Sequence, residues 1–247
     1  MIGMTSVTFR NNSVEEIIAL CKECCIECIE WGGDVHVPPD DIKNAERVGE
    51  LTRKAGICVS SYGSYFKVGV DSINDFKKVL STAKALKAPV IRVWCGEKSS
   101  ESTKNEEFEC YVSCLKEMCG LAEQDNITIA CEFHNNTYND TAKTALKLIR
   151  GANCGNLKSY WQTITYDETD LENLKALNYN TVNVHVFSWN KRGKRYALEK
   201  KLKLWKEYIK AGKDYNVNYI LEFVKNDSHK QFAKDVKVLK ALSEGKI

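Results

Sequence analysis

Short apolar runs alternate with segments of helical periodicity along the whole chain, and this alternation constrains the fold more than any other feature. The strand-like runs are residues 2–9, 25–31, 57–63, 89–94, 127–133, 157–163, 181–187 and 218–224. The helical segments are residues 14–25, 41–55, 72–87, 106–124, 140–150, 170–177, 196–213 and 228–243. Strict alternation predicts a parallel sheet covered by helices, and eight such units favour closure into a barrel. We therefore predict an α/β fold, a single (β/α)8 TIM barrel formed by residues 1–247. The alternative, an open doubly wound sheet, is less favoured because no glycine-rich phosphate-binding loop follows any strand.

The segment 21-CKECCIEC-28 contains two overlapping C-x-x-C spacings, which raise the question of a zinc or iron–sulfur site. The same segment continues one face of a helix, which a capping box of Ser13 and Glu16 would open. The residues on that face are Val14, Ile17, Ile18, Cys21, Cys24 and Cys25. Because free cysteine packs as a small apolar residue and no second pair stands at metal spacing, we favour core cysteines over a metal site.

Charge and the N-terminal sequence restrict where the protein acts and what it binds. The net charge is only +3, from 36 basic and 33 acidic residues spread along the chain. This balance predicts neither a nucleic-acid footprint nor a membrane patch. The first residues, MIGMTSVTFR, lack the basic and apolar regions of a signal peptide, and eleven cysteines suit a reducing compartment. We expect a cytoplasmic protein.

Chemically active side chains recur where the predicted strands end. In a barrel of this kind the catalytic groups lie at the C-terminal ends of the strands. Glu132 and His134 end the fifth run and share a face, because strand side chains alternate with period two, and His185 shares a face with Asn183 in the seventh. Glu222 interrupts the apolar eighth run. The second, fourth and sixth runs end with Glu30, with Arg92 and Trp94, and with Tyr160 and Gln162.

Three carboxylates near the ends of three strands are hard to explain as packing, because an unpaired buried carboxylate costs several kcal/mol. A divalent cation would offset the charge of Glu30, Glu132 and Glu222, and oxygen plus imidazole ligands suit Mn, Mg, Co or Zn. Structural alternatives remain open. Glu30 can pair with Arg92, His134 can bond to the backbone of its own loop, and His185 can be a hydrogen-bonded core histidine. Trp94, Trp161 and Trp189 are either core residues or apolar walls for a sugar ring.

Over nearly its full length the chain resembles the xylose isomerase-like TIM-barrel family of sugar phosphate isomerases and epimerases. The segments that carry this resemblance are IEWGGDVH (29–36), SSYGSYFKVG (60–69), VIRVWCG (90–96), IACEFHNNT (129–137), YWQT (160–163), VNVHVFSW (182–189) and ILEFVKND (220–227). In the family's epimerases a Glu, an Asp, a His and a second Glu from strands five to eight hold the metal. The resemblance implies that Glu132, Gln162, His185 and Glu222 take these places. Gln162 replaces the charged Asp, which implies weaker binding of a more Lewis-acidic ion.

The resemblance implies a metal-dependent sugar or sugar phosphate isomerase/epimerase that works through an enediolate, with Glu132 and Glu222 as the acid/base pair. The residues expected to bind the substrate are Glu30, His36, Arg92, Trp94, His134 and Trp189. Two alternatives are an inosose-dehydratase-like lyase acting on a cyclic polyol and a non-catalytic sugar-binding barrel whose metal site has decayed. Cleavage of abasic DNA is disfavoured, because four histidines are too few for three zinc ions. Relatives often form dimers or tetramers, so a homo-oligomer is compatible with the resemblance.

Overall fold

A computed structural model describes all 247 residues, and its eight strands close into a parallel barrel in sequence order. The strands are β1 (Ile2–Thr5), β2 (Cys28–Gly32), β3 (Cys58–Val68), β4 (Val90–Cys95), β5 (Thr128–Cys131), β6 (Leu157–Trp161), β7 (Thr181–Val186) and β8 (Asn218–Leu221). Each strand pairs in parallel with the next, and β1 pairs with β8 to complete the circle. The predicted (β/α)8 TIM barrel is confirmed.

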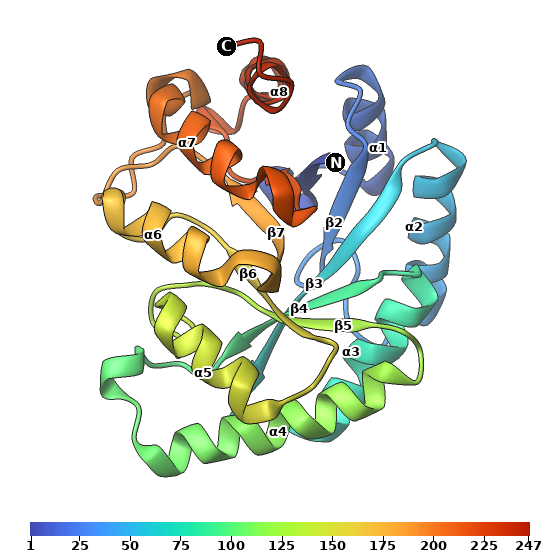
Figure 1. The fold of residues 1–247 in the computed structure, drawn as a ribbon. Coiled ribbons are helices and arrows are strands. Elements are labelled where there is room, and N and C mark those ends of the chain that lie inside the picture. The colour runs from blue at the N-terminus through green and yellow to red at the C-terminus, as the bar shows by residue number, and fades with distance from the viewer.

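Eight helices surround the strands (Figure 1). They are α1 (Val14–Glu23), α2 (Ile42–Lys54), α3 (Ile73–Leu86), α4 (Asn105–Glu123), α5 (Ala142–Ala152), α6 (Glu168–Leu177), α7 (Leu202–Gly212) and α8 (His229–Ser243). Their apolar stripes pack on the outside of the barrel, as Phe76, Val79 and Leu80 of α3 and Phe232, Val236 and Leu239 of α8 illustrate. One continuous cluster of buried apolar side chains joins the two layers.

Several predicted element boundaries differ from the structure, and two of them coincide with contacts to distant segments. The first predicted strand was extended to residue 9, but residues 6–9 form a short 3-10 helix. Ser6 Oγ accepts a hydrogen bond from the N–H of Gly32 (2.9 Å), which turns the chain away from the ladder. The seventh helix begins at Leu202 rather than at residue 196. Upstream of it, the N–H of Leu198 donates to Asp235 Oδ1 of α8 (2.9 Å) at the start of a separate 3-10 turn.

The cysteine-rich segment is part helix and part turn. The predicted capping box is present, with Ser13 Oγ accepting from the N–H of Glu16 (3.2 Å) and Glu16 Oε2 accepting from the N–H of Ser13 (2.6 Å). The helix then ends at Glu23. Cys21 is buried as predicted, whereas Cys24 is half-buried and Cys25 is exposed with a left-handed backbone (φ 53°). The core prediction therefore holds for Cys21 and is wrong for Cys25, and all eleven cysteines are free thiols.

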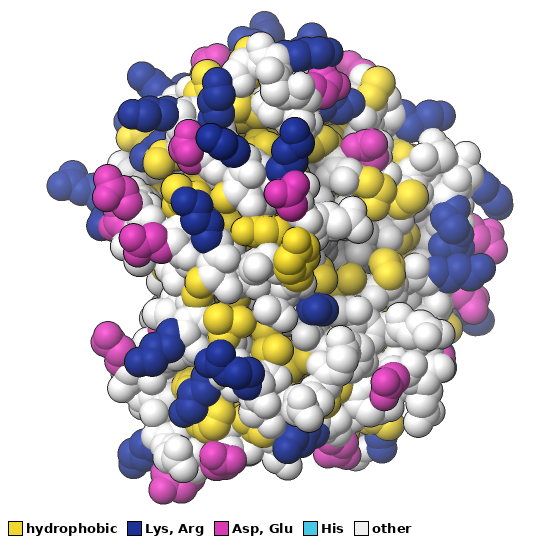
Figure 2. All heavy atoms as spheres, in the orientation of Figure 1, with side chains coloured by type: hydrophobic (Ala, Val, Ile, Leu, Met, Phe, Trp, Pro, Cys, Tyr) yellow, Lys and Arg dark blue, Asp and Glu magenta, His cyan; other side chains and the backbone are white.

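Basic and acidic side chains are interspersed on the face of the molecule that Figure 2 shows, with no large area of one sign. No helix has both the length and the apolar character that a membrane crossing requires.

Candidate functional site

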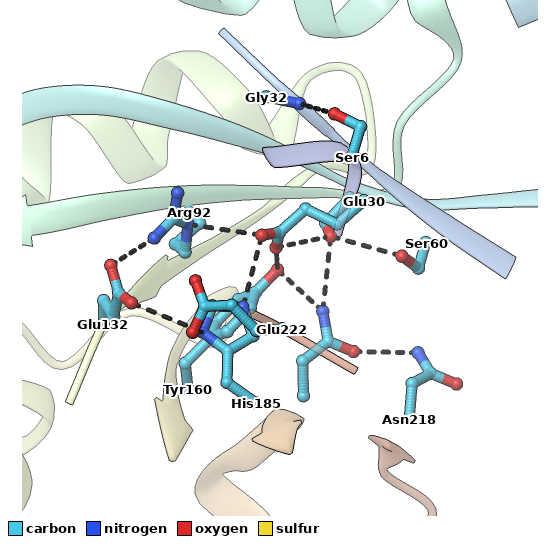
Figure 3. Close-up of polar contacts among 12 residues, drawn as sticks. Ser6, Glu30, Gly32, Ser60, Arg92, Glu132, Tyr160, His185, Asn218 and Glu222 are labelled. Carbon is cyan, nitrogen blue, oxygen red and sulfur yellow. Dashed lines mark hydrogen bonds and ion pairs between the residues drawn. The ribbon is translucent and has the colours of Figure 1, made fainter. Parts of the chain in front are cut away.

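Five charged side chains converge at the C-terminal mouth of the barrel (Figure 3). Glu30 comes from β2, Arg92 from β4 and His185 from β7, whereas Glu132 and Glu222 directly follow β5 and β8. All five are buried. The N–H of Glu132 donates to Val93 O (2.9 Å) and that of Glu222 to Val186 O (3.0 Å). Because these bonds extend each ladder by one residue, both carboxylates point into the barrel.

His185 lies at the centre of this cluster. Its Nε2 is 3.2 Å from Glu30 Oε1, and its Nδ1 is 3.3 Å from Glu132 Oε1 and 3.5 Å from Glu222 Oε2. Burial alone would lower the pKa of the imidazole, but the surrounding carboxylates, with Glu222 and Glu30 foremost, raise the pKa to about 10. Without a metal, His185 therefore carries a proton and a positive charge among three carboxylates.

Glu30 is the deepest carboxylate and holds His185 from below. It accepts hydrogen bonds from Ser61 Oγ (3.0 Å) and Tyr160 Oη (2.7 Å), and its Oε1 is 3.6 Å from Arg92 Nε. Burial would raise the pKa of Glu30, but Arg92 and His185 outweigh burial and lower the pKa to about 2. Gly63 of β3 leaves room for this ion pair, since a Cβ at Gly63 would lie 3.1 Å from both Arg92 Nη2 and Glu30 Oε1.

The remaining two carboxylates have different surroundings. Both Arg92 Nη1 and Trp94 Nε1 donate to Glu132 Oε2. Although burial opposes ionisation of Glu132, Arg92 and His185 hold its pKa well below its usual range. The carboxylate of Glu222 receives no comparable hydrogen bond and faces only His185. Burial, together with the nearby charge of Glu132, raises the pKa of Glu222 in spite of His185.

A cavity of about 420 Å³ opens above the cluster. Its lining includes Arg92 and three of the four predicted metal ligands, Glu132, Gln162 and Glu222. The fourth, His185, lies directly beneath the cavity. Aromatic residues of the lining include Tyr65, Trp94, Trp189 and Phe223. Trp189 packs against Phe223 with ring centroids 5.5 Å apart.

The structure brings most of the predicted substrate-binding residues to this cavity, but His36 is not among its lining residues. The Nε2 atom of His36 is 3.0 Å from the backbone oxygen of Asn12, and its ring packs edge-on against Trp31. Glu30 lies below the cavity and reaches it only through His185 and Arg92.

The prediction that His134 shares a strand face with Glu132 is wrong. The strand β5 ends at Cys131, so Glu132 and His134 do not share a strand face. The ring of His134 instead stacks on Trp94, with centroids 5.2 Å apart, and its Nδ1 lies 2.5 Å from Asn135 O of its own loop. It still lines the cavity beside Glu132.

Sequence reasoning assigned no role to the residues that hold the cluster from beneath. Tyr160 donates to Glu30, and Asn183 Nδ2 in turn donates to Tyr160 Oη (2.7 Å). The signal in the sequence was that Asn183 shares a strand face with His185 and that Tyr160 stands at the end of the sixth run. The sequence did not reveal that Tyr160 bonds to Glu30, because the two residues lie 130 positions apart in the chain.

The donor atoms of the cluster suit a divalent cation, although they are not arranged as a formed metal site. Atom Nδ1 of His185 is buried without a hydrogen-bond partner and faces two carboxylate oxygens within 3.5 Å. Ligand atoms around an ion at about 2.1 Å lie roughly 3 Å apart, so a small contraction would suffice. No three His, Cys, Asp or Glu side chains already stand in metal-site geometry, because Arg92 and His185 hold the carboxylates in ion pairs.

The net charge of the cluster also favours a divalent cation. Three carboxylates face one guanidinium and one imidazolium, which leaves one negative charge uncompensated. Metal ligation requires a neutral imidazole, so a cation would replace the proton on His185. A divalent cation in place of that proton makes the cluster neutral. The residues present therefore fit a divalent metal ion by donor type and by charge.

Comparison with known proteins places these features in a family. Residues 18–165 match the family model described as "Xylose isomerase-like TIM barrel". The chain is 25% identical to a 3-dehydroshikimate dehydratase of Bacillus anthracis over 167 residues, which are 63% of this chain and 59% of that protein. The match thus spans less than two thirds of the relative's length.

Solved structures share the fold over nearly all of the chain. The "probable 3-DHS dehydratase AsbF" of Bacillus anthracis superposes with a TM-score of 0.84 at 19% identity, covering 97% of this chain and 98% of the other. D-psicose 3-epimerase of Clostridium cellulolyticum H10 has a TM-score of 0.76 at 13% identity, with coverage of 99% and 98%. An IolI protein with a bound zinc atom has a TM-score of 0.74 at 15% identity, with coverage of 99% and 96%. At such identities the likeness establishes the fold alone.

Proposed function

The chain belongs to the xylose isomerase-like TIM barrel family, and from that premise we propose that it is a divalent-metal-dependent lyase that removes water from a small cyclic hydroxy-ketone. One observation carries the proposal. Glu132 and Glu222, which line a cavity with tryptophan walls, each have a carboxylate oxygen within 3.5 Å of Nδ1 of His185. Similarity to a dehydratase in sequence, and to a dehydratase structure at a TM-score of 0.84, supports dehydration as the reaction.

Glu132, His185 and Glu222, with the side-chain oxygen of Gln162, would hold the ion. When bound, a divalent cation at this place acts as a Lewis acid that polarises the substrate carbonyl. Glu30 accepts the Nε2–H of His185, which fixes the tautomer in which Nδ1 is the free ligand atom. Carboxylate–histidine pairs of this kind orient metal-binding imidazoles.

Glu222 is the better group for proton transfer. Arg92 and Trp94 hold Glu132 on one oxygen, whereas no side chain other than His185 faces the carboxylate of Glu222. In the proposed reaction Glu222 takes the proton from the carbon next to the carbonyl. The electrons of that C–H bond form a carbon–carbon double bond as the C–O bond of the neighbouring hydroxyl breaks. Glu222 then returns the proton to the departing hydroxyl, and the products are an enone and water.

The cavity wall supplies the contacts that would position the substrate. Trp94 and Trp189 offer flat apolar faces for a carbocyclic ring. His134, which stacks on Trp94, can bond to a hydroxyl beside the reacting carbons. Arg92 keeps Glu132 ionised and lines the cavity beside it.

A second candidate is the metal-dependent sugar or sugar phosphate isomerase/epimerase expected from the sequence. Here Glu132 and Glu222 would exchange protons at one carbon, through an enediolate, from opposite sides. The convergence of both carboxylates on His185 favours it, and epimerases are among the proteins that share the fold. A sugar-binding barrel without catalysis is the remaining alternative, since Gln162 carries no charge.

The experiment incubates purified protein and Mn²⁺ with 3-dehydroshikimate, with inososes, and with a panel of ketoses and their phosphates. Dehydration produces a new enone or aromatic absorbance, whereas isomerisation and epimerisation put solvent deuterium into the sugar without that absorbance. We expect the absorbance, and a loss of roughly 10²–10⁴-fold in kcat for Glu222→Gln. The matched control is Glu117→Gln on the exposed side of α4. Turnover that needs no metal, or that survives Glu222→Gln, would refute the proposed mechanism, and sugar binding without any turnover would support the non-catalytic barrel.

A further inference from the structure

A second cavity, of about 310 Å³, adjoins the first at the same end of the barrel. It lies between the loop that follows β1, the end of the loop between β7 and α7, and the segment that joins β8 to α8. We call it the arginine pocket; its lining includes Arg10, Asn12, Arg195, Phe223, Asp227 and His229. Arg10 and Phe223 line both cavities, so one molecule can extend from one into the other.

Positive charge exceeds negative charge in this lining. It contains two guanidinium groups against the single carboxylate of Asp227, while Asp34, which pairs with Arg10, lies outside the lining. Arg195 Nη1 pairs with Asp227 Oδ1, but the Asp227 side chain is 63% exposed, and such exposed pairs are weak. A guanidinium has five N–H donors, and the remaining ones of Arg195 have no protein acceptor. They are available to a ligand.

Aromatic rings hold Arg195 at the border between the cavities. Its guanidinium carbon lies 4.8 Å from the ring centroid of Phe223 and 5.4 Å from that of Trp189. Cation–π contact orients the planar group and leaves its edges free for hydrogen bonds. Arg10 is held differently, by an ion pair with Asp34 and a hydrogen bond to Tyr65 Oη (2.9 Å), and neither of these residues lines the arginine pocket.

The loop after β8 has an unusual backbone that joins the two cavities. Phe223, Asn226 and Asp227 have φ values of 49°, 59° and 47°. The left-handed region costs a bulky residue such as Phe free energy, and strain of this kind is typical of functional sites. The N–H of Phe223 donates to Thr8 Oγ1 (3.3 Å), which ties the loop to the segment after β1. As a result Glu222 points into the first cavity while Phe223 forms the wall between the two.

We propose that the arginine pocket binds an oxyanion of the substrate, a phosphate or a carboxylate, while the reacting carbons lie in the adjacent cavity. This inference rests on the proposed function of that cavity. It narrows the substrate to an anionic hydroxy-ketone, because Arg10 and Arg195 match the planar, multidentate geometry of oxyanions. A neutral sugar offers these guanidinium groups only uncharged hydroxyl oxygens, which form weaker hydrogen bonds than an oxyanion does.

The first test measures binding of inorganic phosphate to the metal-free protein by titration calorimetry at low ionic strength. Arg195→Gln should weaken binding by about tenfold or more, since charge-assisted hydrogen bonds are lost. Arg192→Gln is the matched control, because it removes the same charge from the same loop outside the pocket lining. Equal affinities for all three proteins, or equal losses in both variants, would overturn the inference.

A gain of affinity cannot result from misfolding, so Asp227→Asn is the second variant. It removes the carboxylate that competes for Arg195, and Asn tolerates the left-handed backbone at this position. Phosphate should bind this variant several-fold more tightly. Unchanged or weaker binding, with an unchanged circular dichroism spectrum, would contradict the assignment of Arg195 as the anion ligand.

The third test identifies the source of the anion and separates this inference from the proposed function. Fructose 6-phosphate and 3-dehydroshikimate are compared with neutral fructose for binding to Glu222→Gln, which should lack turnover but retain the pocket. Tighter binding of the phosphate ester indicates a phosphorylated substrate, and tighter binding of 3-dehydroshikimate a carboxylated one. If the wild type binds the anions selectively but shows no turnover, the proposed function is refuted and the anion subsite is supported. Equal binding of all three probes would overturn the anion subsite.

Discussion

At the scale of single residues, the most informative contact is the one between Glu30 and His185. Glu30 lies below the cavity, and three groups on other strands bond or pair with it from within the barrel: Ser61, Tyr160 and Arg92. Its contact with Nε2 of His185 decides which imidazole nitrogen faces Glu132 and Glu222. We therefore propose that Glu30 positions His185, and its sequence-based assignment to the substrate stays a prediction.

Replacing Glu30 should weaken metal binding without removing a ligand. In Glu30→Gln the hydrogen bond to His185 loses its charge, and loss of such a partner typically costs 10–100-fold in metal affinity. Titration with Mn²⁺ measures this affinity, and Tyr160→Phe, which removes only one of the bonds to Glu30, should show a smaller loss. The same Mn²⁺ affinity in Glu30→Gln and wild type would rule out the positioning role.

Gln162 is the residue at which the chain departs from the pattern expected for its family. It lines the cavity beside Glu132 and Glu222 but adds no negative charge. Gln162→Asp should therefore bind Mn²⁺ more tightly, since a carboxylate is a stronger ligand than an amide for hard cations. Gln162→Asn, which keeps the amide, is the control for side-chain length. If both variants bind Mn²⁺ equally, position 162 does not contact the ion.

At the scale of elements, the loop between β6 and α6 depends on one buried carboxylate. Asp170 of α6 accepts hydrogen bonds from the N–H groups of Ile164 (3.0 Å), Thr165 (3.0 Å) and Tyr166 (2.7 Å). This arrangement holds the loop over the helix N-terminus and brings Tyr166 to the cavity that Glu132 and Glu222 line. The helical period predicted that α6 exists, but nothing in that period marked Asp170 as the anchor of a loop.

Asp170→Ala should lower the free energy of unfolding substantially. Three part-buried N–H groups would lose their acceptor, at about 1 kcal/mol for each hydrogen bond, so we expect a loss of about 3 kcal/mol. Denaturant unfolding followed by circular dichroism measures it. Asp167→Ala, which removes the exposed N-cap of the same helix, is the comparison and should cost clearly less. A comparable loss in both variants would show that the loop contacts add little.

At the scale of the whole molecule, the eleven thiols report on the packing of the barrel. Cys25, Cys58 and Cys110 are exposed, whereas Cys21, Cys28, Cys95, Cys119 and Cys131 are buried. Burial also raises the pKa of the Cys28 thiol to about 12, and only the thiolate reacts with alkylating reagents. Low accessibility and a raised pKa therefore both slow the alkylation of the buried thiols.

Iodoacetamide should label the three exposed cysteines of the folded protein within minutes and the five buried ones only after unfolding. Mass spectrometry of tryptic peptides identifies the labelled positions, with protein in denaturant as the control for full labelling. Rapid labelling of Cys95 or Cys131 under native conditions would mean that β4 and β5 open far more often than a closed barrel allows.

The sequence by itself determined the architecture, because periodicity is a local property. Apolar residues at spacings of two and of 3.6 require strands and helices that bury those faces, and their alternation leaves few topologies. The N-terminal capping box of α1, formed by Ser13 and Glu16, was likewise predictable because its hydrogen bonds are local. The strand ends were predicted only approximately. Residues 6–9 leave the ladder where Ser6 bonds to the distant Gly32, and the N–H of His134 bonds to Asn139 O of its own loop.

Only the tertiary structure decided which polar groups meet. Glu30 and His185 are separated by 155 residues, and Arg10 and Arg195 come from opposite ends of the chain. Ring closure brings β1 next to β8 and thereby forms the arginine pocket, which no stretch of sequence contains. The physical reason is that partner choice depends on distances across the barrel. A residue's own neighbours in sequence determine which way it points, but they do not determine what it faces.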